Sequence, residues 1–284
     1  MNDREKNKVL PGVLYLVATP IGNLADTSER ALKVLSEVDV IAAEDTRNSL
    51  KFLTHFGISK PLVSYYEHNK KERGREIVAS LKDGKAWALI TDAGTPAISD
   101  PGEDLVRLCA QENITVTSIP GASAVVNALA LSALSTRRFI FEGFLEGKKK
   151  ERREYLESMK REMRTMIFYE APHDLLETLL LMAEVFGGTR RLALCRELTK
   201  LNEEIMRVTL DEAILYYNEH DPRGEYVLVV EGACDGDEDL FFANMTVEEH
   251  VEHYISLGLS KMDAIKQTAK DRGVPKGVIY KAIL

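Results

Sequence analysis

A compact group of reactive side chains follows one short apolar run of the sequence. Val38–Ala43 predicts a buried strand, and it leads directly into Glu44, Asp45, Thr46 and Arg47. Two carboxylates and a guanidinium would then lie at one edge of a sheet. Such a group can act as an acid or base, clamp a polar substrate or form a buried ion network, and spacing alone does not rank these roles. A second group, Arg196–Lys200 with Glu203 and Glu204, ends a later apolar run.

Two loops that follow apolar runs are rich in residues that fix backbone geometry. Thr19–Leu24 follows the first run, and Thr91–Pro96 follows the fourth, with Asp100–Gly102 close behind. Glycine allows positive φ or the close approach of a ligand, and proline removes backbone freedom. Ligands of open α/β sheets bind at the carboxyl ends of the strands. These loops are therefore candidate ligand sites, and tight turns without a ligand are the structural alternative.

The elements that must position these loops alternate between strand and helix. Strands are predicted at Val13–Ala18, Val38–Ala43, Leu62–Tyr65, Ala86–Thr91 and Ile114–Ile119. Helices are expected from Asp26 or Thr27 onward, and at Asn48–Phe56, Lys71–Lys82 and Gly102–Glu112. This alternation predicts a mainly parallel sheet covered on both faces. Further strands are expected at Arg138–Phe144, Thr165–Tyr169, Arg190–Cys195, Glu204–Val208 and Tyr226–Val230.

Three domains are predicted: an α/β domain over residues 1–120, a second α/β domain over 121–235, and a helical extension over 240–284. The acidic stretch Asp235–Asp239 marks the second boundary. In the extension, the apolar spacing resembles a helix-turn-helix with Gly273 at the turn and Lys276 and Lys281 on the second helix. A simple packing hairpin fits this spacing equally well.

The charge and apolar content of the sequence limit the kinds of partner that the protein can bind. The 284 residues carry a formal net charge of -8, which disfavours non-specific binding to a phosphate backbone. Residues 148–164 and 260–284 nevertheless each carry a local charge of +4. Each segment is either a nucleic-acid-binding surface or a solvated helix face. Neither a signal peptide nor an apolar run of about 20 residues is evident, so a soluble, cytoplasmic protein without membrane contact is expected.

Several familiar sites are excluded by the absence of their motifs. The sequence contains no G-x-G-x-x-G after a strand, no phosphate-binding P-loop, no G-x-S-x-G and no H-E-x-x-H. Cys109, Cys195 and Cys234 are far apart and have no C-x-x-C spacing, which predicts neither a disulfide framework nor a zinc site. The histidines lie mostly singly, so no metal is expected.

Taken in order, the loop motifs resemble the ribosomal RNA small subunit methyltransferase I branch of the tetrapyrrole methylase superfamily. The resemblance spans roughly residues 13–232 and is carried by Val17–Leu24, Glu44–Arg47, Asp92–Pro96, Ser99–Gly102, Pro120–Ala124, Tyr169–His173 and Arg196–Lys200. Members that methylate porphyrinoids, and the diphthine synthases, typically have a glycine-rich loop after the first strand. Thr19–Asn23 occupies that position here, which favours the RNA branch.

The resemblance implies a homodimer of two-domain α/β chains with S-adenosylmethionine in the cleft between the domains. It also implies 2′-O-methylation of a cytidine of small-subunit ribosomal RNA near the decoding centre. The residues expected to bind the cofactor are Asp92, Ala93, Gly94, Thr95, Pro96, Ser123, Tyr169, Leu198, Gly224 and Glu225. Those expected to bind the RNA are Thr19, Pro20, Asn23, Glu44, Lys148, Arg152 and Lys276.

A ribose hydroxyl is a weak nucleophile, so a base or a cation near the developing alkoxide is expected. Asp45 and Arg47 are the first candidates for this role, and Lys200 or Glu204 the second. Two other functions remain open at this stage. One is a methyltransferase acting on a small tetrapyrrole, and the other is a non-enzymatic nucleic-acid-binding regulator that uses the helix-turn-helix.

Overall fold

The computed structural model describes residues 7–233 and 245–283. The chain divides into two compact units, one of Met1–Ser158 with Arg164–Glu231 and one of Met159–Met163 with Gly232–Leu284. Both sheets belong to the first unit. The predicted domain limits stay predictions: the acidic stretch at 235–239, like Cys234, lies outside the described residues.

The first sheet is wholly parallel, as the strand and helix alternation predicts. Its strands are β1 (Val13–Val17), β2 (Val40–Ala43), β3 (Leu62–Ser64), β4 (Trp87–Ile90) and β5 (Thr115–Ile119). They lie in the order β3-β2-β4-β1-β5, with all four pairings parallel. The carboxyl ends of β1, β2 and β4 therefore meet at one edge of the sheet, which brings their following loops together.

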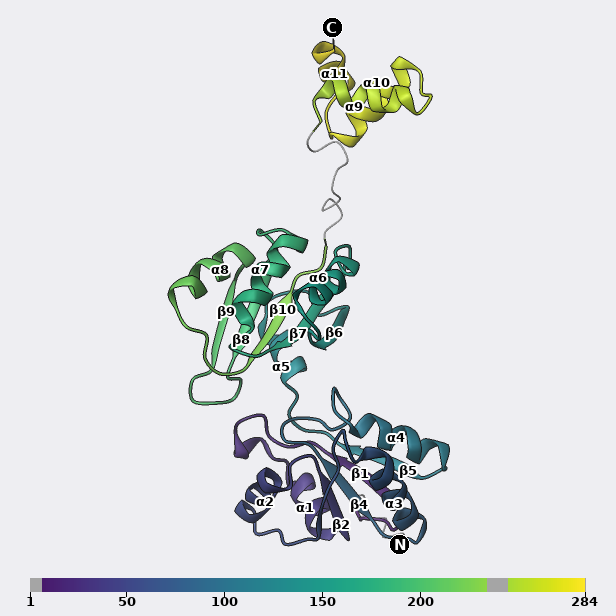
Figure 1. Cartoon of the computed structure of the whole chain (residues 1–284), viewed down its shortest axis with the longest axis vertical. Coiled ribbons are helices and arrows are strands. Elements are labelled where there is room, and N and C mark those ends of the chain that lie inside the picture. Colours follow the sequence, from purple (N-terminus) through teal and green to yellow (C-terminus); the bar gives the residue numbers. More distant parts are fainter. Residues whose placement is uncertain (1–6, 234–244, 284) are drawn as a thin grey trace, which may run out of the picture. The chain divides into compact units, whose positions relative to one another are not determined.

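Helices cover both faces of this sheet: α1 (Glu29–Glu37), α2 (Thr46–His55), α3 (Lys70–Lys82) and α4 (Gly102–Gln111). Successive side chains along each strand point to opposite faces of the sheet and pack into different cores. Tyr15 of β1 packs with α1 and α2, whereas its neighbour Leu14 packs with α3 and α4, so each strand contributes to two cores (Figure 1). This is the doubly covered α/β architecture predicted from the sequence.

The start of the first helix differs from the prediction. Instead of a helix opening at Asp26 or Thr27, a 3-10 turn occupies Leu24–Asp26, and Asn23 caps it by accepting from the N–H of Ala25. Helix α1 then begins at Glu29, where the Ser28 hydroxyl accepts from the N–H of Ala31. Thr27 is extended as well, but its hydroxyl donates to the carbonyl of Leu24, so Ser28 is the residue that caps α1.

The second sheet is mixed. Its strands are β6 (Phe139–Phe144), β7 (Thr165–Glu170), β8 (Arg191–Arg196), β9 (Glu204–Thr209) and β10 (Tyr226–Val230), in the order β6-β7-β10-β8-β9. Only β6 and β7 are parallel, and β10 runs antiparallel between β7 and β8. The start of β10 therefore lies at the same edge as the ends of β7 and β8, which is how Glu225 reaches the loops that follow those two strands.

Helices also flank this sheet. On one face, α5 (Ala124–Leu131) buries Val125, Ala128 and Leu129 against Val227 and Val229 of β10. On the other lie α6 (Lys149–Ser158), α7 (Leu175–Phe186) and α8 (Leu210–Glu219) (Figure 1). Helix α8 begins with a capping box in which Thr209 and Glu212 bond each other's backbone N–H groups.

The described part of the C-terminal unit contains three helices, α9 (Val247–Ser256), α10 (Lys261–Asp271) and α11 (Lys276–Ala282). Its buried core is formed by Val251, Ala264, Ile265, Ala269 and Ile279. Most of the apolar positions predicted for this segment therefore face its interior, but Val278, which belongs to the same predicted spacing, is exposed. Gly273 adopts a φ of 63° at the turn between α10 and α11, as expected for a glycine C-cap. No helix in the described part of the chain is long and apolar enough to cross a bilayer.

Candidate functional site

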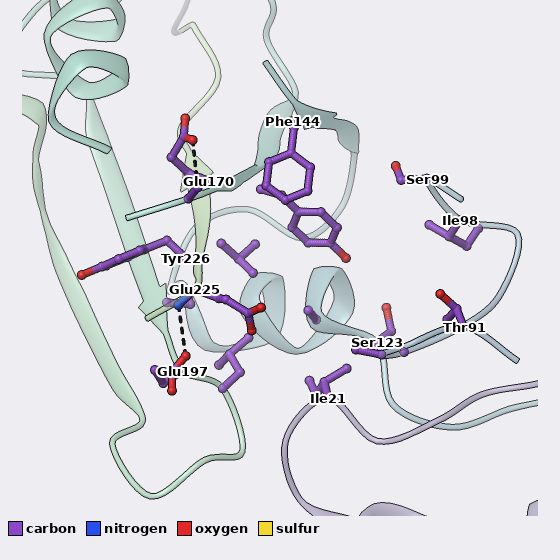
Figure 2. Close-up of a pocket in the computed structure, with 18 of the residues that line it drawn as sticks. Ile21, Thr91, Ile98, Ser99, Ser123, Phe144, Glu170, Glu197, Glu225 and Tyr226 are labelled. Carbon is purple, nitrogen blue, oxygen red and sulfur yellow. Dashed lines mark hydrogen bonds between the residues drawn. The ribbon is translucent and has the colours of Figure 1, made fainter. Parts of the chain in front are cut away.

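A cavity of about 450 Å³ opens where the carboxyl ends of the first sheet face the matching edge of the second. Loops of the first sheet carry Thr91, Ile98, Ser99 and Ser123 on one side, and Phe144, Glu170, Glu197 and Glu225 lie opposite (Figure 2). The other lining residues are Ile21, Glu44, Ala93, Gly94, Thr95, Asp100, Ala124, Tyr169, Ala171, Pro172, Cys195, Leu198, Lys200, Tyr226 and Val227. This set is called the main cavity below.

The loop after β4 forms a rigid wall of the main cavity. Thr19 and Gly94 exchange both backbone hydrogen bonds, which ties this loop to the loop after β1. The Asp100 carboxylate accepts from the N–H groups of Ala97 and Gly102 at 2.8 and 2.6 Å, and burial raises its pKa in spite of these bonds. Ala97 and Ser99 sit at φ values of 68° and 57°, a conformation that these internal bonds stabilise.

Aromatic side chains supply much of the apolar surface on the opposite wall. The rings of Phe144 and Tyr169 lie 5.4 Å apart, and Tyr169 also contacts Phe141 edge to face at 4.9 Å. The register between β6 and β7 shifts between Phe141 and Gly143, so Glu142 is an extra residue of β6 without a partner on β7. Burial raises the pKa of Tyr169, which therefore stays neutral and acts as a packing surface.

A lysine bridged by two carboxylates lines the main cavity. The Lys200 ammonium lies 2.8 Å from Glu197 Oε1 and 2.8 Å from Glu225 Oε2. Desolvation opposes its charge, but the hydrogen bonds to both carboxylates prevail and raise the pKa of Lys200. The hydrogen bond from Lys200 lowers the pKa of Glu197. Lys200 and Glu197 are therefore charged at neutral pH.

Strained backbone holds this bridge. Glu197 and Thr199 have φ values of 50° and 66°, and Gly224 has a φ of 80°. A Cβ atom at Gly224 would lie 2.5 Å from Glu197 Cγ, so only glycine allows these two segments of the chain to approach this closely. Positive φ at residues other than glycine costs free energy and is frequent at ligand sites.

The main cavity carries an excess of negative charge. Among the described residues that line it, five are carboxylates (Glu44, Asp100, Glu170, Glu197 and Glu225), and Lys200 is the single cation. Glu44 accepts a hydrogen bond from the Thr91 hydroxyl at 3.2 Å, and partial desolvation raises its pKa although the residue remains exposed. Such a cavity favours a cationic ligand and disfavours a phosphate.

A second cavity of about 300 Å³ adjoins the first. The two share Ile21, Thr91, Ala93, Lys200 and Glu225. The remaining lining residues of this second cavity are Thr19, Pro20, Gly22, Leu24, Asn48, Ser49, Phe52, Ile90 and Asp92. Lys200 therefore lines both cavities.

Most residues predicted to bind a cofactor line the main cavity: Ala93, Gly94, Thr95, Ser123, Tyr169, Leu198 and Glu225. Asp92 lies elsewhere, in the second cavity. Pro96 and Gly224 line neither cavity, and they shape the loops that do. The cofactor contacts predicted for these two residues stay predictions.

The predicted catalytic residues do not gather in one place. Asp45 caps α2 and accepts from the guanidinium of Arg47 at 3.2 and 3.0 Å, bonds that lower the pKa of Asp45. Neither residue lines either cavity. Glu204 binds Arg196 at 2.8 Å and lines a separate pocket. Of the four candidates, only Lys200 lines the main cavity.

The predicted substrate residues are scattered as well. Thr19 and Pro20 line the second cavity and Glu44 the main one, while Asn23 caps the 3-10 turn. Arg152 binds Asp174 at 3.0 Å and the carbonyl of Gly147. Other cations of α6 also pair with carboxylates, which fits the alternative of a solvated helix face. Lys148 and Lys276 are exposed, on the two different units.

Several lining residues escaped the sequence prediction. Ile98, Phe144 and Tyr226 carry no motif, because apolar side chains of this kind occur throughout any core. Glu197 and Asp100 could have been predicted, since they lie within the loop motifs Arg196–Lys200 and Ser99–Gly102. No group of three metal-ligating side chains is found in residues 7–233 and 245–283.

The family model and the related sequences that match this chain point to the same protein family. Residues 13–214 match the model of the tetrapyrrole (corrin/porphyrin) methylases. The chain is 50% identical over 271 residues to the ribosomal RNA small subunit methyltransferase I of Halalkalibacterium halodurans, covering 95% of this chain and 93% of the relative. The protein of that name from Bacillus subtilis is 48% identical over 274 residues, covering 95% and 94%.

Solved structures agree on the fold. A diphthine synthase superposes with a TM-score of 0.58 at 12% identity, covering 80% of this chain and 92% of that one. The uroporphyrin-III-C-methyltransferase of Thermus thermophilus gives a TM-score of 0.53 at 19% identity, covering 77% and 94%. At these identities, the likeness concerns the fold alone.

Replacing Gly102 by alanine tests the rigidity of the wall after β4. The added Cβ would lie 2.7 Å from Asp100 Oδ1 and 3.0 Å from the nitrogen of Ala97. We expect the free energy of unfolding to fall by about 1–3 kcal/mol, because the loop must shift. Urea unfolding followed by the fluorescence of Trp87, the single tryptophan, measures it.

The matched control is Gly74→Ala in α3, where the nearest atom, Leu108 Cδ2, would lie at an ordinary 3.4 Å. This variant should be as stable as the parent or gain about 0.5–1 kcal/mol from helix propensity. Equal stability of the Gly102 variant and the parent would contradict the account of this wall.

Proposed function

The chain belongs to the ribosomal RNA small subunit methyltransferase I group of the tetrapyrrole methylase family, and from this premise we propose that it methylates the 2′-hydroxyl of a cytidine in 16S ribosomal RNA, with S-adenosylmethionine as the donor. The group suggested by the loop motifs is thus the group to which the chain belongs. We further propose that the modified nucleotide lies near the decoding centre, that the protein acts in the cytoplasm, where ribosomal subunits are found, and that it forms a homodimer.

The charge of the main cavity carries the proposal for the donor. S-adenosylmethionine has a positive sulfonium and a positive amino group against one carboxylate, so it is a net cation without phosphate. Five carboxylates against one lysine fit that charge, whereas they would repel a phosphorylated cofactor. Phe144, Tyr169, Ile98 and Val227 add apolar surface. The volume of about 450 Å³ is within the usual range for small-molecule sites.

The sulfonium supplies an already activated methyl group, so the protein must mainly orient the acceptor and exclude water. In the transfer, the ribose oxygen forms a bond to the methyl carbon, the carbon–sulfur bond breaks, and the hydroxyl proton leaves. The residues at the junction of the two cavities are placed for this step, since Thr91, Lys200 and Glu225 line both.

We assign Lys200 to the negative charge that develops on the ribose oxygen. Two carboxylates hold its ammonium in place, so the cation is positioned before the reaction begins. For the proton, Glu44 is better suited than Asp45. Asp45 is bound by Arg47 and has a lowered pKa, whereas Glu44 lines the main cavity and has a pKa raised by desolvation.

RNA binding needs positive surface outside the acid-rich cavity. The cations of α6 pair largely with carboxylates, so we place the main contribution on the C-terminal unit. Lys276 and Lys281 are exposed on α11 beside Tyr280, an arrangement suited to phosphate contact and base stacking.

Incubating the protein with methyl-labelled S-adenosylmethionine and small ribosomal subunits from cells that lack it tests the function. The expected result is one labelled cytidine, whose mass shift survives as a 2′-O-methyl group after digestion to nucleosides. Large subunits are the control and should stay unlabelled. Label on a porphyrinoid and none on the subunit would favour the rival tetrapyrrole methyltransferase and sink this proposal.

Lys200→Met tests the assignment of the cation. The single-turnover rate with saturating donor and subunits should fall about 100-fold, because one preorganised charge at the reacting oxygen is lost. Lys200→Arg should recover part of the rate. The control is Lys70→Met, which removes a lysine that is likewise held by two carboxylates, Glu67 and Asp104, outside both cavities. A Lys200→Met rate equal to that of the parent would refute the assignment.

A further inference from the structure

The second cavity differs from the main one in having a polar edge over an apolar floor. Its edge carries Asn48 and Asp92, and its floor includes Phe52 and Ile90. We propose that this cavity receives the base of the acceptor nucleotide and selects a base with an exocyclic amino group, cytosine or adenine, against uracil. The inference rests on the proposed function, because it names the part of the RNA substrate that this site recognises.

The position of the second cavity follows from the residues it shares with the first. Thr91, Ala93, Lys200 and Glu225 border both spaces. A ribose at this border would place its hydroxyl beside Lys200 and direct its base into the second cavity. The methyl donor would then occupy the main cavity on the other side. One nucleotide and one donor thus account for two connected cavities.

The polar edge presents an acceptor beside a donor. The Asn48 amide donates to Asp92 Oδ2 at 3.3 Å, and the N–H of Asp45 donates to Asp92 Oδ1 at 3.2 Å. These bonds fix the carboxylate, which retains further lone pairs, and the amide nitrogen keeps a second hydrogen. An acceptor next to a donor matches the amino group and ring nitrogen of cytosine or adenine. Uracil presents the reverse order, with O4 as acceptor and N3–H as donor.

A buried hydroxyl gives a second, independent indication of a ligand. Ser49 is only 4% exposed, it lines the second cavity, and its Oγ has no hydrogen-bond partner among the described residues. An unpaired buried hydroxyl costs free energy, which a polar ligand atom can recover. The remaining polar atoms of a base are of this kind. Ser49 follows Asn48 on α2, so one helix supplies both contacts.

The charges exclude the phosphate group as the occupant. Asp92 and Glu225 face the second cavity, and of the described residues that line it, Lys200 is the only cation and already binds two carboxylates. A phosphate would be repelled, while an uncharged base with amino hydrogens is attracted. The backbone phosphates of the RNA must therefore lie outside this cavity.

Asp92→Asn tests the inference, because the amide replaces an obligate acceptor by a group that can also donate to O4 of uracil. The substrates are small subunits carrying either cytidine or uridine at the acceptor position that mass mapping identifies. For the parent, kcat/KM should favour cytidine by about 10-fold or more, as a well-formed pair of hydrogen bonds gives. In the variant, this preference should shrink at least about 10-fold, while the affinity for S-adenosylmethionine stays unchanged.

The control is Asp26→Asn, the same change of charge at an exposed residue that lines neither cavity, and it should keep the parent's preference. An unchanged preference in the Asp92 variant would overturn the inference. A parent that methylates no subunit would instead overturn the proposed function.

Crosslinking gives an outcome even if the Asp92 variant is inactive. RNA with 5-iodocytidine at the acceptor position is irradiated with the Lys200→Met protein, which binds without rapid transfer. The crosslinked peptide should come from α2, with Phe52, or from the loop that contains Leu24. A crosslink confined to residues of the main cavity, or to neither cavity, would contradict the placement of the base.

Discussion

The excess of carboxylates in the main cavity is the constraint from which the other features of the site follow. Five carboxylates and one lysine in a partly enclosed space can tolerate a cation far more readily than an anion. That balance favours a cationic ligand over an anionic one. Under the proposed function, the cation is the sulfonium donor, and the RNA phosphates are bound by positive surface elsewhere. The same balance also explains why Lys200 needs two carboxylates, since the same groups that fix the cation keep it charged.

The fold creates this balance by joining edges of two differently built sheets. In the first sheet, parallel strands bring the loops after β1, β2 and β4 to one edge. In the second, the antiparallel β10 begins where β7 and β8 end, so Glu170, Glu197 and Glu225 converge from three strands. The positive φ values at Glu197, Thr199 and Gly224 let the loop after β8 and the segment before β10 approach closely enough for Glu197 and Glu225 to share Lys200.

The fold was largely predictable because its signals are local. Apolar runs, turn residues and helix periods predicted ten strands and the parallel first sheet, and the spacing around Gly273 matched the core of the C-terminal unit. The first helix was misplaced because Asp26, Thr27 and Ser28 are all residue types that can cap. Hydrogen bonds distinguish the last two: the Thr27 hydroxyl donates to Leu24, whereas the Ser28 hydroxyl accepts from the N–H of Ala31. The loops after β1 and β4 were found from their glycines and prolines, and both line cavities.

The roles of single residues were less predictable, because they depend on contacts between distant segments. Asp45 and Arg47 looked reactive as neighbours, yet they satisfy one another at the start of α2. Lys200 pairs with Glu225, 25 positions away, and Asp92 is fixed by Asp45 and Asn48 from the start of α2. In the basic run at 148–164, Lys149 and Arg153 pair with carboxylates of α7, contacts that the sequence did not indicate, and the RNA contacts predicted for this run stay predictions.

The central claim is that the main cavity holds the methyl donor, and calorimetric titration with S-adenosylmethionine tests it most directly. Ala124 lines this cavity at the start of α5, and its replacement by phenylalanine would fill part of the space without changing the charge. The account predicts one donor molecule bound per chain in the parent and at least about 100-fold weaker binding in Ala124→Phe, with the thermal unfolding temperature little changed. Equal affinity of the parent and this variant for the donor, or no affinity in the parent, would contradict it.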